Sequence, residues 1–219
     1  MGKIKIRILI WIAALVPLII VAAVYQSLPD QVIMQWQQNG AVRYDDKINL
    51  WWVAGMSPFL AALLMLVPKI DPRKKNYVKF RGFYDGLCLF IMLFMIAITA
   101  LVIAENRNPG SVQISAVVMG ACGLMFAFIG NMLPKFKSNY FAGFRTPWTL
   151  SSDEVWRKTH RIAGFMWFFG GLLIAVLSFF LREAETALIT AFISVTLVIT
   201  LVPLVMSFIW YQRFPRKDD

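Results

Sequence analysis

The chain of 219 residues is 59% hydrophobic and only 16% charged, with a mean hydropathy of +0.65. Soluble domains carry about 25% charged residues, so this composition, with several apolar runs of about 20 residues, excludes an ordinary soluble domain and predicts a membrane protein with several spans. The net charge of +10 would suggest nucleic-acid binding in a soluble protein. In membrane proteins Lys and Arg gather in cytoplasmic loops, so topology explains the charge and we expect no direct nucleic-acid partner.

Six apolar runs are long enough to cross a bilayer as helices. The first follows Lys3, Lys5 and Arg7, as a signal-peptide core would, but it is longer and lacks an A-x-A-like cleavage site, so we expect a retained helix. Pro17, Pro58 and Pro203 lie inside spans. We predict one all-α membrane domain over 1–219, a six-helix bundle with spans at about 8–25, 50–67, 86–104, 112–133, 162–181 and 187–211.

The distribution of Lys and Arg predicts which side each polar segment faces. Six spans place both termini on the same side. Eighteen of the 22 Lys and Arg residues lie in the two terminal segments and in the loops 68–81 and 134–161, and four lie in the alternate segments. Because positive residues favour the inside, we predict that both termini and the two basic loops are cytoplasmic and that the segment 26–49 faces outward.

The longest polar passage, 130–164, contains the only histidine, His160. Ser151 and Glu154 have the spacing of a capping box, which predicts a helix start that continues into the fifth span. A spacing of four then places Trp156 and His160 on one face with Gly164.

Residue chemistry alone leaves two interpretations of this passage open. Basic residues beside a span are commonly headgroup anchors, tryptophans at a span end form interfacial belts, and a lone histidine is commonly structural. A simple anchor needs only Lys and Arg, however, whereas this loop also contains Asn, Trp, Thr, His and Pro. On residue types alone the anchor interpretation is favoured, and this mixture keeps a functional motif open.

The chain contains no pattern typical of an enzyme or a metal centre. There is no Walker loop, GxSxG or HExxH motif, and one histidine provides no metal-ligand set. Cys88 and Cys122 lie singly in apolar runs, where small buried packing residues are expected. A serine or threonine with His160 as base would lack a third partner. We therefore expect no cofactor, metal or enzymatic activity. Asp85, at the mouth of the third span, is a candidate because ionisable residues at membrane depth are costly; as a plain helix-start carboxylate it would need no function.

Two segments that follow spans resemble each other. Leu66-Val67-Pro68-Lys69-Ile70, followed by Asn76-Tyr77, is similar to Met132-Leu133-Pro134-Lys135-Phe136, followed by Asn139-Tyr140. An old duplication with parallel halves would produce this echo. The similarity would arise equally well without duplication, because proline and lysine are both common at helix ends.

The residues of the loop carry a family resemblance. Gly130-Asn131, Pro134-Lys135, Asn139-Tyr140-Phe141, Gly143 to Leu150 and Val155 to Arg161 resemble the signature of the SdpI family of bacterial immunity proteins. The outward segment, Leu28-Pro29-Asp30 to Asn39-Gly40 and Lys47, resembles the short domain of DUF1648 type near the start of that family. Gln35 stands where that domain usually has a histidine before the aromatic residue. The expected motif residues are Asn131, Pro134, Asn139, Gly143, Arg145, Pro147, Trp148, Thr149, Trp156 and His160, with Asp85, Pro29, Trp36 and Gly40 as secondary candidates.

The resemblance implies a multi-pass protein of the bacterial plasma membrane that protects the cell against a secreted, membrane-damaging peptide toxin. It also implies a receptor role, in which the toxin-engaged protein holds a small helix-turn-helix repressor at the membrane. The expected partners are therefore a peptide toxin outside and, inside, such a repressor and anionic lipids. A small-solute transporter or channel is the alternative, although the spans carry few ionisable residues. A second alternative function, less supported by the residue types, is that of a membrane enzyme acting at the cytoplasmic face.

Overall fold

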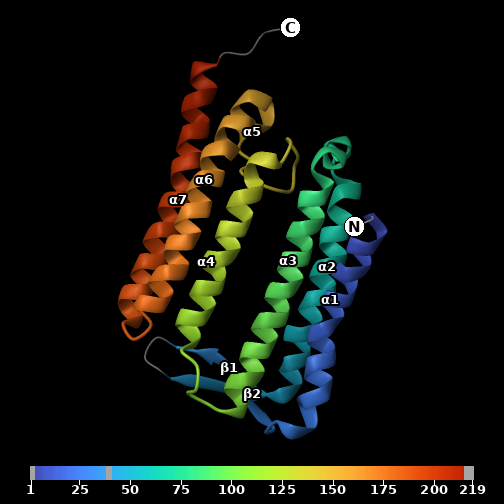
Figure 1. Ribbon diagram of the computed structural model, residues 1–219, viewed down its shortest axis with the longest axis vertical. Helices are drawn as coiled ribbons and strands as arrows, with labels where there is room; N and C mark the ends of the chain where they lie inside the picture. Colours follow the sequence, from blue (N-terminus) through green and yellow to red (C-terminus); the bar gives the residue numbers. More distant parts are fainter. Residues whose placement is uncertain (1–2, 38–40, 215–219) are drawn as a thin grey trace. The chain divides into compact units, whose positions relative to one another are not determined.

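The computed structural model describes residues 3–37 and 41–214; Gly40, a secondary candidate, lies outside them. In this part of the chain six helices are long and apolar enough to cross a membrane, which confirms the predicted fold class, a multi-pass membrane helix protein. They are α1 (Lys3–Val24), α2 (Leu50–Ile70), α3 (Lys74–Arg107), α4 (Ile114–Met132), α6 (Asp153–Phe180) and α7 (Glu185–Arg213) (Figure 1). Two compact units, Met1–Leu66 with Asp85–Val118 and Val67–Tyr84 with Met119–Asp219, are described in turn.

The first unit contains a β-hairpin that the sequence analysis treated as polar loop. Strands β1 (Gln31–Trp36) and β2 (Val42–Asp46) pair antiparallel between α1 and α2. Val32 of β1 is fully buried, because it joins an apolar cluster with residues from the ends of α1, α2 and α3 and their connections, namely Val21, Leu28, Leu50, Ala54 and Ile103. The outward segment is thus a folded cap on these helix ends.

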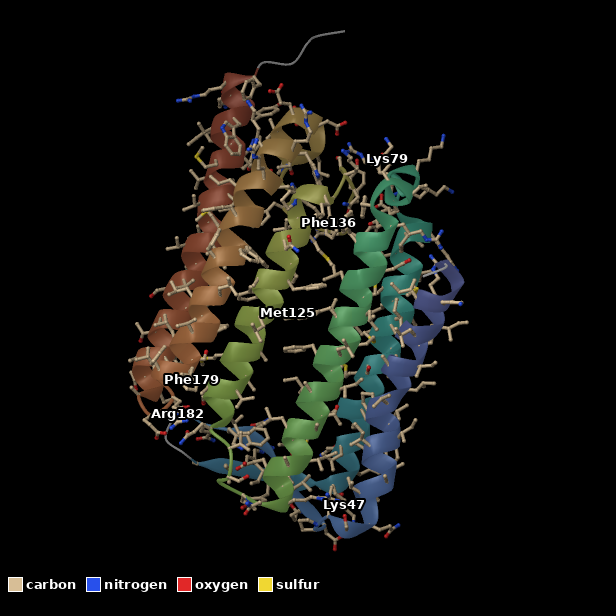
Figure 2. The ribbon with its side chains drawn as sticks, viewed as in Figure 1. Lys47, Lys79, Met125, Phe136, Phe179 and Arg182 are labelled. Atoms are coloured by element: carbon tan, nitrogen blue, oxygen red, sulfur yellow. The ribbon has the colours of Figure 1, made fainter. Side chains whose placement is uncertain are left out.

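Two polar contacts fix the hairpin within this unit. The buried side-chain amide of Asn106, near the end of α3, accepts a hydrogen bond from the Ile33 N–H at 2.6 Å and donates one to the Ile33 carbonyl at 3.0 Å. Lys47, labelled in Figure 2, forms an ion pair with Asp30 at 2.7 Å. The hydrogen bond and the charge of Lys47 hold the pKa of Asp30 below its usual value. The hydrogen bonds of Asn106 therefore hold β1, and the ion pair of Lys47 with Asp30 holds the two ends of the hairpin together.

In the second unit, α4 and α6 approach so closely that glycine is required at the contact. A Cβ atom on Gly123 of α4 would lie 2.7 Å from the Gly171 carbonyl oxygen and 2.8 Å from the Ala175 nitrogen of α6. One on Gly130 would lie 2.8 Å from the Gly164 carbonyl oxygen. Small residues allow backbones to meet in this way in membrane helices, so backbone contact sets the position of α6, which carries His160.

Helix α7 contains Pro203, and a neighbouring helix compensates for it. Proline has no N–H, so the carbonyl of Ile199, four residues earlier, lacks its helical partner. Trp167 of α6 donates its indole N–H to that carbonyl at 3.0 Å. The buried proline is therefore tolerated because α6 supplies the missing hydrogen bond.

Replacing Trp167 with phenylalanine should destabilise the protein, and part of that loss should depend on Pro203. The hydrogen-bond contribution is about 1 kcal/mol for a bond between membrane helices. In a Pro203→Ala background the helix regains its own bond to Ile199, so the Trp167→Phe penalty should shrink by that amount. Thermal unfolding of the four variants in detergent micelles measures the coupling, and strictly additive effects would refute it.

The second unit also corrects two expectations about the loop 68–81. Helix α2 continues to Ile70 and α3 begins at Lys74, so most of the predicted basic loop is helical. Backbone angles at Phe80 are non-helical, which marks a kink inside α3. Asp85, with which the first unit resumes, is buried and lies inside α3 and not at the start of the helix. Hydropathy misplaced these helix ends because charged residues on a helix that extends past its apolar stretch lower the average hydropathy.

Candidate functional site

The segment after α4 forms a compact loop in the second unit, with a short 3-10 turn (Leu133–Lys135) at its start and α5 (Pro147–Ser151) near its end. Phe136, labelled in Figure 2, is buried, and its ring centroid lies 5.1 Å from that of Phe80 in α3. The indole N–H of Trp156 in α6 donates to the Phe136 carbonyl at 2.9 Å. The beginning of the loop is thus held between α3 and α6.

Asn139 organises the middle of the loop. Its side-chain oxygen accepts hydrogen bonds from the N–H groups of Phe141 at 2.9 Å and Ala142 at 2.7 Å. Its side-chain nitrogen donates to the carbonyls of Lys137 at 2.9 Å and Ala142 at 3.2 Å. Asn139 is fully buried, so one side chain satisfies backbone groups that the tight turn would otherwise leave unpaired.

Asp71, between α2 and α3, is the counterpart of Asn139. One carboxylate oxygen accepts the Arg73 N–H at 2.6 Å, and the other accepts the Tyr140 N–H at 2.9 Å and the Tyr77 hydroxyl at 3.0 Å. The Tyr77 hydroxyl also lies 3.2 Å from the Asn139 side-chain oxygen. A hydroxyl has one proton, which the shorter distance and the charge assign mainly to Asp71.

Two side chains at the start of α3 complete this attachment. Arg73 donates to the Ser138 hydroxyl and, at 2.8 Å, to the Leu150 carbonyl, while its guanidinium lies 5.1 Å from the centre of the Tyr140 ring. Asn76 donates to the Ser138 carbonyl at 2.7 Å. Arg73 therefore holds the loop in place through two of its residues, Ser138 and Leu150.

His160 holds the second half of the loop against α6. Its Nε2 accepts the Phe144 N–H at 3.1 Å, so the ring proton lies on Nδ1, which donates to the Trp156 carbonyl at 2.9 Å. The imidazole stacks on the Trp156 ring with centroids 4.0 Å apart. Both nitrogens of this buried, neutral ring are bonded to backbone groups, so neither is available as a general base in this conformation.

Gly143 is the one loop residue that requires glycine. Its φ is +101°, and a Cβ atom there would fall on Nε2 of His160. The positive φ is costly for other residues, and the position has no room for a side chain. Gly143 therefore allows the backbone to approach His160 closely enough for the Phe144 hydrogen bond.

Replacing Gly143 with alanine should open the loop. The variant incurs backbone strain of about 1–3 kcal/mol and, in addition, displaces His160. Gly110→Ala is the matched control, because Gly110 also has a positive φ, +78°, but has no atoms within 4 Å of its added Cβ. Trypsin cleavage after Arg145 should rise strongly in Gly143→Ala only. Equal cleavage in both variants would show that steric contact with His160 is unimportant.

The helix starts in this region differ from those predicted. The capping box is formed by Thr146 and Thr149, whose side chains each bond the other's backbone N–H, and α6 is capped by Ser152, which accepts the Val155 N–H. The predicted box at Ser151 and Glu154 is wrong because the short helix α5 ends at Ser151. The predicted continuation of α6 into the fifth span is confirmed, and the first turn of α6 is acidic, with Asp153 and Glu154.

Helix α5 is docked on α7 within the same unit. The Thr146 hydroxyl lies 3.2 Å from that of Ser207, and the Trp148 ring centroid lies 5.0 Å from that of Phe208. The Thr149 hydroxyl donates to the Phe144 carbonyl at 2.7 Å. The loop therefore has contacts with α3, α6 and α7.

The structure brings only part of the predicted motif together. Asn139, Thr149, Trp156 and His160 are buried in the network, and Gly143 lies on His160. Asn131, Pro134, Arg145 and Pro147 are exposed at its edges, and Trp148 is half-buried. The secondary candidates Pro29, Trp36 and Asp85 belong to the other unit.

Several residues of the network were missing from the predicted set, among them Asp71, Arg73, Asn76, Tyr77 and Ser138. Two signals could have found some of them. Asp71 is the only acidic residue in the basic segment 68–81. The second signal is the similarity of Asn76-Tyr77 to Asn139-Tyr140, because the two similar segments contact each other in the structure.

The arrangement is suited to recognition. Among the described residues no group of three or more His, Cys, Asp or Glu could hold a metal ion. The network instead fixes a surface on which Tyr140 and Phe141 are about 40% exposed beside Arg145. The Arg145 guanidinium donates to the Tyr140 carbonyl at 2.8 Å. An aromatic and cationic surface on a rigid support is a typical protein-contact surface.

Comparisons with known proteins agree with the resemblance seen in the sequence. The model of the SdpI/YfhL protein family matches residues 135–207, which include most of the loop with α5, α6 and part of α7. The immunity protein SdpI of Bacillus subtilis (strain 168) is 27% identical over 176 residues, covering 80% of this chain and 83% of that protein. No solved structure matches. The similarity to the SdpI family is thereby confirmed, and the DUF1648-type segment stays a prediction.

Proposed function

We propose that this chain, whose residues 135–207 match the SdpI/YfhL family, is an immunity protein of the bacterial plasma membrane that protects the cell against a secreted peptide toxin. The observation that carries the proposal is the loop held by this network, which lies at the start of the family match. Its buried polar side chains are satisfied by backbone groups, and its exposed ones form a contact surface. This division supports recognition and gives no support to catalysis.

The proposal is tested by toxin challenge. The chain is expressed in a Bacillus subtilis strain that lacks its own SdpI and is sensitive to the toxin which that protein counteracts. Expression of this chain should restore growth, and an empty vector should not. Normal membrane levels without any gain in survival would contradict an immunity function toward that toxin.

We also propose that both termini and the loop 134–161 face the cytoplasm. The uneven distribution of Lys and Arg supports this orientation. A reporter enzyme that is active only in the cytoplasm, fused after Asp219, should be active, and one fused in place of the hairpin tip should not. The reverse pattern would overturn the orientation.

An inward partner is the finer part of the proposal. Exposed lysines surround the loop in the same unit, namely Lys74, Lys75, Lys79, Lys135 and Lys137. Such a surface suits anionic lipid headgroups, and a helix-turn-helix repressor held at the membrane is the protein partner that the family resemblance suggests. Retention of a tagged candidate repressor from the genomic neighbourhood on vesicles containing the protein, but not on empty anionic vesicles, distinguishes the two partners.

A further inference from the structure

The β1–β2 hairpin has two outer edges, and among the described residues only that of β1 is closed. At β1 the amide of Asn106 accepts the Ile33 N–H and donates to the Ile33 carbonyl, as a third strand would. An edge that is closed in this way cannot pair with another strand. The outer edge of β2 has no such cover from the side chains of the described residues.

The register identifies the open backbone groups of β2. In an antiparallel ladder, opposite residues alternate between pairs that bond each other and pairs whose N–H and C=O groups point away. Ile33 is opposite Tyr44, and the groups of Ile33 point away from β2, toward Asn106. The N–H and C=O of Tyr44 therefore point outward from the free edge of β2. Among the described residues Tyr44 makes no hydrogen bond outside the hairpin.

The side chains of β2 are also exposed. Tyr44 is 54% exposed and Val42 36%. Natural edge strands are commonly protected by charged side chains, especially lysine, by proline or by a bulge. Strand β2 has the charged residues Arg43, Asp45 and Asp46 but neither lysine nor proline, and the register shift lies on β1 between Ile33 and Gln35. Arg43 and Asp45 flank Tyr44, and neither forms an ion pair within the described residues.

The charges of Arg43 and Asp45 are complementary to those of a second, antiparallel copy of β2. If two copies of β2 pair antiparallel with Tyr44 opposite Tyr44, then Arg43 of each copy lies opposite Asp45 of the other. The outward groups of the two Tyr44 residues then form the hydrogen-bonded pair on the two-fold axis. Opposite charges directly across a ladder are stabilising, and like charges are destabilising. The register that pairs the Tyr44 backbone groups is therefore also the register that places opposite charges across from each other.

We propose that the free edge of β2 pairs with β2 of a second copy of this chain, so that two hairpins form one four-stranded sheet. Because Asn106 closes the other edge, the assembly ends at two copies and does not continue into a filament. The inference goes beyond the proposed immunity function, since it concerns the outer hairpin and holds whatever the protein recognises.

Cysteine cross-linking in membranes tests the pairing. Hydrogen-bonded residues opposite each other have Cα atoms about 5.5 Å apart, within the range that a disulfide bridges. In a background in which Cys88 and Cys122 are serine, Tyr44→Cys should form a disulfide-linked dimer under mild oxidation. Ile48→Cys, exposed just outside the strand, is the matched control and should not.

Charge reversal then tests the register. Arg43→Asp places like charges across the axis, as does Asp45→Arg, and each should lower the Tyr44→Cys cross-linking about tenfold. The double reversal restores opposite charges and should restore the cross-link. Absence of a homodimer with Tyr44→Cys, a cross-link that ignores the single reversals, or a cross-link only to a different protein would each overturn the proposal.

Discussion

Replacing Asn139 with alanine is expected to open the loop and to abolish protection while the six helices remain inserted. The change removes a fully buried side chain that bonds backbone groups of Lys137, Phe141 and Ala142. A buried group left without its partner costs about 1–3 kcal/mol. Because several groups lose theirs together, the fraction of open loop should rise roughly a hundredfold, by local unfolding alone.

Limited trypsin digestion in membranes measures this opening, because Lys137 and Arg145 lie within the loop. The Asn139→Ala variant should be cleaved rapidly after both residues. Asn131→Ala is the matched control, since Asn131 is an exposed asparagine of the same predicted motif. It should be cleaved as slowly as the unchanged protein. Slow cleavage of Asn139→Ala would show that the network does not hold the loop.

Replacing Gly123 with alanine is expected to damage the packing between α4 and α6 severely. The added Cβ would meet backbone atoms of Gly171 and Ala175 at under 3 Å, and backbone atoms cannot move aside as a flexible side chain can. Forced separation of tightly packed elements costs about 1–3 kcal/mol. Since α6 carries Trp156 and His160, the shift should also weaken the attachment of the loop.

Gly82→Ala provides the control, because Gly82 is helical and has no atoms within 4 Å of an added Cβ. Alanine there should leave stability unchanged or raise it by about 1 kcal/mol, through higher helix propensity. Thermal unfolding in detergent micelles measures both variants. A Gly123→Ala protein as stable as Gly82→Ala would contradict the close approach of α4 and α6.

The membrane fold was predictable because the physical signal is long and additive. Each span is about 20 apolar residues, and the bilayer accepts helices because their backbone groups are satisfied internally. The same averaging of hydropathy failed at the ends of the helices. Lys74 to Arg81 belong to a helix that extends past the predicted span, and their charges conceal it. The hairpin was missed because β1 is short and its burial depends on contacts with residues distant in sequence, such as Asn106 and Ile103.

Only those residues of the candidate site that lie close together in the sequence were predictable. Trp156 and His160 were placed on one face by helical spacing, and the structure confirms that both are buried. Asp71 was not predicted, because its role arises from pairing with Tyr140, which is 69 residues away. No spacing rule connects residues at that separation. The echo of the two segments was the one sequence feature that foreshadowed the contact.

The most direct test of the proposed function compares protection by Arg145→Ala and Arg157→Ala at equal membrane levels. Both residues are exposed arginines, but only Arg145 bonds the loop backbone beside Tyr140 and Phe141. If the loop surface carries immunity, the unchanged protein and Arg157→Ala should protect a toxin-sensitive host, and Arg145→Ala should not. Full protection by Arg145→Ala would contradict the assignment of recognition to this surface.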